Sequence, residues 1–224
     1  RKENRALQLT PDNEAVALAQ QFLHRSGIDG ISPIARRVEA DSTRPRKNVV
    51  MILMESMSAS LMQTFGQEAR LTPFLDSLYR RSLSFSRFYS SGIHTNHGLY
   101  SSLYSFPAIM KRNAMKGSVI PVYSGLPTVL KDNGYHNLFF MTHESQYDNM
   151  NAFFRTNGFD EIHSQENYPA DKVVNGFGVQ DDFLFSYALP VLDRRAQSGQ
   201  PFFSVLLTIS NHPPYVIPPH LRPH

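Results

Sequence analysis

The chain of 224 residues contains no cysteine and no tryptophan. The absence of cysteine excludes a disulfide framework, a zinc–thiolate cluster and a cysteine nucleophile. No apolar run reaches the roughly 18 residues of a membrane-spanning helix, and we find no signal-peptide pattern. Neither sign of charge dominates, because 22 basic residues face 19 acidic ones, so the composition does not indicate nucleic-acid binding. A hydrophobic content of 41% is ordinary for a globular protein with one large domain or two small ones.

The first 46 residues predict a helical lead-in and a linker without chemistry of their own. Thr10-Pro11-Asp12 is typical of a helix start, and residues 32–46 are rich in Arg, Pro and Ser. We therefore expect residues 47–224 to carry the function. The chain does not begin with methionine, so we expect a piece of a longer protein whose membrane anchor, if it has one, lies outside this sequence.

Three apolar runs predict the strands of one sheet. The run from Val49 to Met54 has the length of a central strand that is buried on both faces, and Asn137–Met141 and Phe202–Thr208 predict two further strands. Residues 83–89 alternate apolar and polar side chains, which predicts a half-buried strand. Helical segments separate the runs. The sequence therefore predicts an α/β fold with a mainly parallel central sheet and helices on both faces.

Polar side chains follow these strands. Glu55 follows the first run, His143 and Glu144 follow the second, and His212 follows the third. The carboxyl ends of parallel strands meet at one edge of a sheet, where ligands bind in open α/β folds. Thr95 lies in a polar loop that leads into a helix, where backbone N–H groups favour phosphate. This convergence predicts a functional site at that edge.

Each residue also has an ordinary interpretation. Glu55 can be a solvated loop residue, Thr95 can cap its helix, and His212 can be a packing residue. His94 and His97, which flank Thr95, are expected at the surface.

Glu55 and Thr95 together are compatible with a metal-activated nucleophile. A shared divalent ion would lower the pKa of the hydroxyl and stabilise charge on a transferring phosphoryl group. Two ligands are too few to hold such an ion, so an oxygen-rich site requires at least one more carboxylate or imidazole.

Several motifs resemble those of lipoteichoic acid synthase-type phosphoglycerol transferases, in the sulfatase-like branch of the alkaline phosphatase superfamily. They are Asn-Val-Val-x-Ile-x-x-Glu-Ser at 48–56, Thr-Pro-Phe-Leu at 72–75, Gly-x-x-Thr at 92–95, Ser-Leu-Tyr-x-x-Pro at 102–107, Gly-Leu-Pro-Thr-Val-Leu at 125–130, Asn-Gly-Phe-Asp at 157–160 and Pro-Phe-Phe…Ser-Asn-His at 201–212. The similarity covers roughly residues 48–215. The motifs are specific only when they are taken together.

The resemblance implies an alkaline phosphatase/sulfatase-like fold and a role for each candidate residue. Glu55 and Thr95 match metal ligands, and Thr95 also matches the covalent nucleophile. His212 matches a residue that contacts the substrate phosphate or glycerol, and His143 and Glu144 lie where substrate is bound. The implied cofactor is Mn²⁺ or Mg²⁺, with Zn²⁺ as an alternative.

The chain departs from this family pattern in two places. The Trp and Arg that help to hold glycerol phosphate have no counterpart, because residues 146–150 supply Gln, Tyr, Asp, Asn and Met. The second pair of metal ligands, an Asp-His dipeptide, does not occur in the sequence. We therefore expect a catalytic domain that is incomplete at its C-terminus and inactive without downstream ligands.

The expected function is metal-dependent transfer of phosphoglycerol from a phospholipid head group to a glycan or polymer hydroxyl through a covalent Thr intermediate. The catalytic part would lie outside the cytoplasm, periplasmic or extracellular, and a segment absent from this chain would anchor it to the cell membrane. The alternatives are a phosphoethanolamine transferase, a hydrolase of phosphodiesters or sulfate esters on the same fold, and a non-catalytic domain that binds envelope glycan or lipid.

Overall fold

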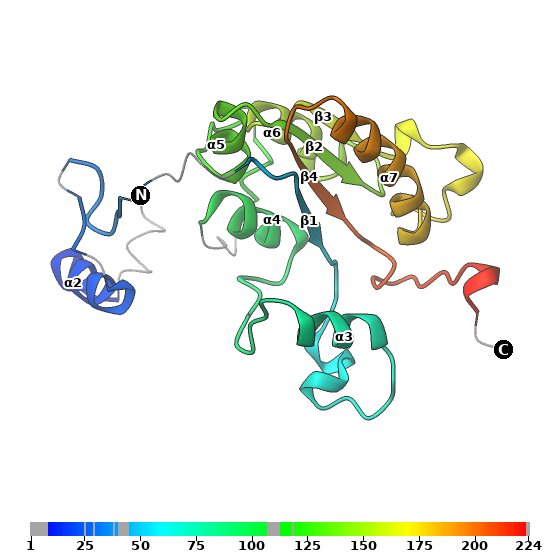
Figure 1. The fold of residues 1–224 in the computed structure, drawn as a ribbon, viewed down its shortest axis with the longest axis horizontal. Coiled ribbons are helices and arrows are strands. Elements are labelled where there is room, and N and C mark those ends of the chain that lie inside the picture. The colour runs from blue at the N-terminus through cyan, green and yellow to red at the C-terminus, as the bar shows by residue number, and fades with distance from the viewer. Residues whose placement is uncertain are drawn as a thin grey trace. The chain divides into compact units, whose positions relative to one another are not determined.

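Two units make up the computed structural model of the chain (Figure 1). It describes residues 9–24, 26–28, 30–37, 39, 45–106, 113–117 and 119–222. Contacts divide the chain after Pro45 into a first unit, residues 1–45, and a second unit, residues 46–224. None of the helices in the described ranges is long and apolar enough to cross a membrane.

The first unit contains helix α2 (Asp12–Leu23). It begins directly after Pro11, as the Thr-Pro-Asp pattern predicts, and it ends where His24 adopts the left-handed conformation. Gln20 Nε2 donates a hydrogen bond of 2.6 Å to Pro33 O, which ties the segment that follows back onto the helix.

The second unit is built on a parallel sheet with the strand order β1-β4-β2-β3. The strands are β1 (Val49–Leu53), β2 (His136–Met141), β3 (Glu161–His163) and β4 (Phe202–Leu207). Because every pair is parallel, all four carboxyl ends lie at one edge. This arrangement confirms the predicted fold class. The three-residue strand β3 was not predicted.

One face of the sheet packs on helices α4 (Thr95–Tyr104), α5 (Leu126–Asp132) and α6 (Met150–Thr156). The buried side chains on this face are mostly aromatic, and Phe139 of β2 stacks on Phe154 of α6 with ring centroids 4.3 Å apart. These buried rings supply the largest apolar areas in the core, and burial of apolar area is the main favourable term in folding.

Helix α7 (Asp181–Gln197) covers the other face. Its buried residues Leu184, Ala188 and Leu192 lie at four-residue intervals and therefore on one side of the helix. They pack against alternate residues of β2 and β4. Helices on both faces of a parallel sheet are thus observed, as predicted.

The remaining elements are short. They are α3 (Pro73–Arg81) and the 3₁₀ helices η1 (Ala59–Leu61), η2 (Gln63–Phe65), η3 (Tyr147–Asn149), η4 (Gln165–Asn167), η5 (Ala170–Lys172) and η6 (Pro219–Leu221). Helix α3 begins at Pro73, directly after its N-cap residue Thr72. Its buried Asp76 accepts hydrogen bonds from the N–H and the hydroxyl of Thr64, which lower the pKa of Asp76 to about 2.

The prediction that the first strand is central and buried on both faces is wrong. β1 is an edge strand of the described sheet, and its burial alternates along the strand. Met51 faces the core, whereas Val50 and Ile52 remain 49% and 47% exposed. The reason is that α7 contacts β2 and β4, so the described residues leave the β1 part of this face uncovered.

The strand predicted over residues 83–89 is also not observed. The backbone there is irregular, and Leu83 and Phe88 are 88% and 82% exposed. An alternating pattern forms a strand only when a neighbouring strand pairs with it, and no strand in the described part of the chain pairs with this segment.

Candidate active site

Three of the predicted site segments lie at the carboxyl edge of the sheet. Glu55 lies two residues after β1, His143 two residues after β2, and His212 five residues after β4. Helix α4 begins at Thr95. The topology therefore brings segments that are far apart in sequence to one edge, as expected for an open parallel sheet.

Glu55 and Thr95 are in direct contact. Thr95 Oγ1 donates a hydrogen bond of 2.8 Å to Glu55 Oε2, and both residues are half-buried. Thr95 does not cap its helix: His94 is the N-cap residue, and Thr95 is the first residue of the helix proper. The ordinary interpretation of Thr95 as a cap is therefore wrong, and its hydroxyl is directed to a carboxylate instead.

The segment that carries Glu55 is tied to the end of β4. Glu55 N donates to Thr208 Oγ1 (3.1 Å), and Asn211 Nδ2 donates to Ser56 O (2.6 Å). Ser56 Oγ also donates to Glu55 Oε1, at 3.3 Å. Both carboxylate oxygens therefore accept hydrogen bonds, and two side chains from the β4 end hold the backbone. This arrangement excludes a freely solvated Glu55.

His143 is buried at the end of β2, whereas the side chain of its neighbour Glu144 is exposed. His143 Nδ1 donates to Glu144 O at 3.0 Å. Burial lowers the pKa of His143, although the Glu144 carbonyl and nearby carboxylates partly oppose this. The ring is therefore neutral near pH 7, with Nε2 as its second polar atom.

His212 lies in a loop that two anchors hold in place. Asp181 Oδ1, at the start of α7, accepts from Ile209 N (2.7 Å) and Ser210 N (3.1 Å). His212 Nδ1 donates to Pro213 O (2.6 Å). The ring also packs on Phe177, with centroids 4.7 Å apart. No hydrogen bond between described residues joins His143 or His212 to the Glu55–Thr95 pair.

The histidines that flank Thr95 differ from each other. His94 is exposed as expected, but His97 is only 2% exposed, so the prediction of a surface residue is wrong for His97. Burial lowers the pKa of His97, and the neighbouring His94 lowers it further. The helical spacing explains the burial, because His97 is on the side of α4 that also carries Tyr100 and Tyr104 into the core.

Sequence reasoning missed the residues that hold this edge together. Thr208 and Glu55 are 153 positions apart in the chain, and Asp181 and Ile209 are 28 positions apart. No local pattern marks Thr208 or Asp181, because each acts through a partner that the fold brings near.

The sulfatase family model matches residues 47–223, almost the whole of the second unit. The chain belongs to the sulfatase family. It is 30% identical over 196 residues to phosphoglycerol transferase I of Xanthomonas campestris, covering 80% of this chain and 27% of that protein. It is 24% identical over 205 residues to the lipoteichoic acid synthase-like protein YvgJ of Bacillus subtilis, covering 84% of this chain and 32% of the relative.

Two solved structures share the fold. A protein of the alkaline phosphatase superfamily from Vibrio parahaemolyticus superposes with a TM-score of 0.83 and 30% identity, covering 94% of this chain and 52% of that one. The lipoteichoic acid synthase LtaP of Listeria monocytogenes gives a TM-score of 0.69 at 24% identity, covering 77% and 42%, and supports the fold alone. The chain thus spans about a third or less of the curated relatives' length.

The Glu55–Thr95 pair matches the donor chemistry of a hard divalent ion, because both donors are oxygen atoms. The number of donors is insufficient: within the described ranges, no group of three or more His, Cys, Asp or Glu side chains is placed to hold a metal. The two oxygen atoms are therefore donors of the right chemical type, but they are too few by themselves to hold such an ion.

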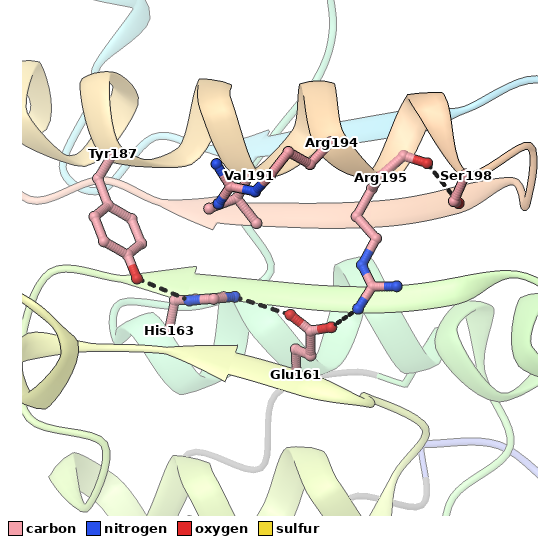
Figure 2. A pocket seen from close by; sticks show the side chains of 7 residues that line it. All are labelled: Glu161, His163, Tyr187, Val191, Arg194, Arg195 and Ser198. Carbon is pink, nitrogen blue, oxygen red and sulfur yellow. Dashed lines mark hydrogen bonds and ion pairs between the residues drawn. The ribbon is translucent and has the colours of Figure 1, made fainter.

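A separate pocket of about 330 Å³ lies between β3 and the end of α7 (Figure 2). Glu161 accepts hydrogen bonds there from His136 (2.8 Å) and His163 (3.2 Å), and Arg195 forms an ion pair with it. None of the predicted site residues lines this pocket. Because three donors already satisfy the Glu161 carboxylate, we interpret the cluster as a structural link between the edge strand β3 and α7.

Proposed function

We propose that this chain is the part of a phosphoglycerol transferase that supplies the nucleophile, Thr95. The observation that carries the proposal is the hydrogen bond of 2.8 Å from Thr95 Oγ1 to Glu55 Oε2 at the carboxyl edge of a sulfatase-family sheet. The names of the relatives, phosphoglycerol transferase I and lipoteichoic acid synthase, support the same reaction class.

The proposed reaction has two displacements at phosphorus. In the first, the Thr95 oxygen forms a bond to the phosphorus of a phosphatidylglycerol head group, and the bond from phosphorus to the diacylglycerol oxygen breaks. The hydroxyl proton of Thr95 leaves, and diacylglycerol departs after gaining a proton. In the second, a glycan or polymer hydroxyl attacks phosphorus, the Thr95–phosphorus bond breaks, and Thr95 regains a proton.

Glu55 orients the nucleophile. Its carboxylate accepts the Thr95 hydrogen bond and thereby directs the hydroxyl proton away from the face that attacks phosphorus. Glu55 and Thr95 would also hold Mn²⁺ or Mg²⁺, with Zn²⁺ as an alternative. When bound, such an ion would lower the pKa of the Thr95 hydroxyl and stabilise the negative charge that develops on the phosphoryl group. Activity requires further ligands from outside the described residues, because two oxygen donors do not hold a divalent ion.

We assign substrate contacts to His143, Glu144 and His212. A neutral, buried His143 offers Nε2 as an acceptor to a glycerol hydroxyl, and the exposed Glu144 carboxylate can accept hydrogen bonds from hydroxyl groups. His212 has one ring nitrogen engaged with Pro213 O, which leaves Nε2 to face substrate.

The rest of the proposal concerns the whole protein. Residues 47–224 would form part of the catalytic domain, and residues 1–46 a lead-in. The donor would be a phospholipid head group and the acceptor a glycan or polymer. The catalytic domain would act outside the cytoplasm, anchored to the cell membrane by a segment not included in this chain.

Head-group release from phosphatidylglycerol by the full-length protein tests the proposal. Thr95→Ala should abolish release of diacylglycerol, whereas Thr95→Ser should retain part of it because the oxygen is kept. Thr156→Ala, which changes an exposed Thr at the end of α6, is the matched control and should leave the rate unchanged.

The same assay separates the alternatives. Faster release from phosphatidylethanolamine would indicate a phosphoethanolamine transferase, and cleavage of a sulfate ester would indicate a hydrolase. If the Thr95→Ala protein released diacylglycerol at the wild-type rate, Thr95 would not be the nucleophile and the proposal would be wrong. Lipid or glycan binding by the full-length protein without turnover would indicate the non-catalytic domain.

A further inference from the structure

Four rings form a continuous row across the carboxyl edge of the sheet. His143 packs on Tyr147 with centroids 4.7 Å apart, Tyr147 lies 6.4 Å from Phe177, and Phe177 lies 4.7 Å from His212. The two outer rings are the imidazoles assigned to substrate. Of the two inner rings, Tyr147 begins η3 and Phe177 lies in the turn before α7. Each imidazole therefore has an aromatic partner within the distance of favourable ring contacts.

A tight turn holds Phe177 in this row. Val174 N donates to Gly178 O and Gly178 N to Asn175 O, both at 2.9 Å, and Phe177 N donates to Asn175 Oδ1 at 2.8 Å. These three bonds fix the backbone on both sides of the ring. Phe177 is consequently presented by a local structure that does not depend on His212.

The turn is also clamped to the end of β2. Gly178 has a φ of +87°, and a Cβ at this position would lie 1.8 Å from Thr142 O, so only glycine fits. Val179 N donates to the same carbonyl at 3.1 Å. The position of Phe177 is therefore set by the end of β2, which His143 follows. The ring of Phe177 nevertheless contacts His212, which follows β4.

His212 lacks an equivalent support of its own. Asp181 anchors the backbone of its loop, but the ring itself is held through Nδ1 by the carbonyl of the next residue, Pro213, which engages only one edge of the imidazole. The ring face of Phe177 supplies the contact that limits rotation of the imidazole. Asn175 Nδ2 also lies 3.5 Å from Pro214 O, which links the same turn to the segment behind His212.

We propose that Phe177 is a positioning residue for His212 and thereby sets how the enzyme binds the transferred phosphoglycerol group. This inference rests on the proposed function, because it takes His212 as a substrate contact. The physical reason is that a side chain held by packing needs no reordering when substrate binds, and small misplacements of such groups cost substantial rate.

A double-mutant cycle in the full-length protein tests this coupling. Phe177→Ala should lower kcat/KM for diacylglycerol release about five- to tenfold, mainly through KM, which corresponds to the energy of one ring contact. Phe177→Tyr keeps the ring and should restore most of the loss. In a His212→Gln background, Phe177→Ala should have almost no further effect, because the group through which it acts is gone. Phe74→Ala, which changes an exposed Phe of α3, is the control and should have no effect in either background.

Two results would overturn the inference. One is a Phe177→Ala loss of the same size with and without His212, which would show that Phe177 acts only on stability or on another group. The other is the absence of any loss.

Calorimetric titration of the Thr95→Ala protein with sn-glycerol 1-phosphate separates this inference from the proposed reaction. Weaker binding in Phe177→Ala, together with no effect of Phe177→Ala when His212 has already been changed to Gln, supports the positioning role even if Thr95 is not the nucleophile. Equal affinity of the Phe177→Ala and parent proteins contradicts the positioning role whatever the role of Thr95.

Discussion

Strands β1 and β4 are neighbours in one sheet, yet their surroundings differ. All six residues of β4 are buried between α7 and the helices on the opposite face, whereas alternate residues of β1 are exposed. The candidate site draws on both regions. His143 and His212 follow the packed central strands. Glu55 follows the more open strand β1, and its segment depends on a few hydrogen bonds to the β4 end, while Thr95 meets Glu55 from the start of α4.

Because of this difference, changes in one region should mainly affect stability and changes in the other should mainly affect activity. Changes in the packed centre should unfold the protein, because cavities there cannot be filled by neighbouring residues. Changes in the ties between β1 and β4 should disturb the geometry of Glu55 with little loss of stability, since the groups involved are partly exposed.

The largest expected effect is in the packed centre. Phe203 of β4 is fully buried, so Phe203→Ala should lower the free energy of unfolding by about 3–5 kcal/mol. Chemical denaturation monitored by circular dichroism measures this change. Phe74→Ala is the matched control and should change it by no more than about 0.5 kcal/mol, because Phe74 is 70% exposed. Similar losses of unfolding free energy in Phe203→Ala and Phe74→Ala would contradict the difference between the packed centre and the exposed surface.

The next effect concerns the ties to β4. Asn211→Ala removes the hydrogen bond of 2.6 Å to Ser56 O beside Glu55. We expect about a tenfold fall in the rate of diacylglycerol release with a loss of about 1 kcal/mol or less in stability. Paired kinetics and denaturation of the full-length protein measure both. A loss of stability without a loss of rate would show that this tie serves the fold and not the site.

These two regions also show what the sequence could predict. The apolar runs identified β2 and β4 almost to the residue, because local chemistry decides such features. The apolar run of β1 was found too, but its edge position was not, because an apolar run carries no information about which strands lie beside it.

Tertiary contacts decide what the sequence could not show. The carboxyl edge and the meeting of Glu55 with Thr95 followed from strand polarity and a family resemblance. The supports of the site did not, because Thr208 and Phe177 each act on a residue far away in sequence. Strand β3 escaped prediction because a three-residue segment is too short for any periodicity.

The pH dependence of stability should reflect the cluster in Figure 2, in the packed region. Burial lowers the pKa of His163 from 6.5, so the unfolded chain binds more protons below that pH and stability falls as the pH drops. Burial opposes ionisation of Glu161, but hydrogen bonds from His136 and Arg195 outweigh it and lower the pKa of Glu161 from 4.5. Its contribution is therefore present above pH 4.5 and is lost as the pH falls through the lower folded value.

Thermal unfolding between pH 7.5 and 5 measures this effect. His163→Phe keeps the stack on Phe140, whose ring lies 4.6 Å away, and removes the titrating group, so the fall in Tm should become shallower. Phe74→Ala changes an exposed side chain without a titratable group and should leave the slope as it is. An unchanged slope in His163→Phe would refute the assignment. The buried His97 and His143 contribute with the same sign, so part of the slope should remain.

The smallest expected effect is on the open flank. Ile52 of β1 is 47% exposed, so Ile52→Ala should cost about 1 kcal/mol, well below the 2–5 kcal/mol of a fully buried Ile. Chemical denaturation measures it alongside Phe203→Ala. A cost typical of a buried residue would show that this face is covered in the protein under test.

The most direct test of the account is to look for the covalent intermediate. The full-length protein is incubated with phosphatidylglycerol in the absence of acceptor, digested, and its peptides are analysed by mass spectrometry. The account predicts a phosphoglycerol adduct on Thr95, in the peptide that follows Arg87, and no adduct in the Thr95→Ala protein. An adduct on another residue, or diacylglycerol release with no adduct at any time point, would contradict it.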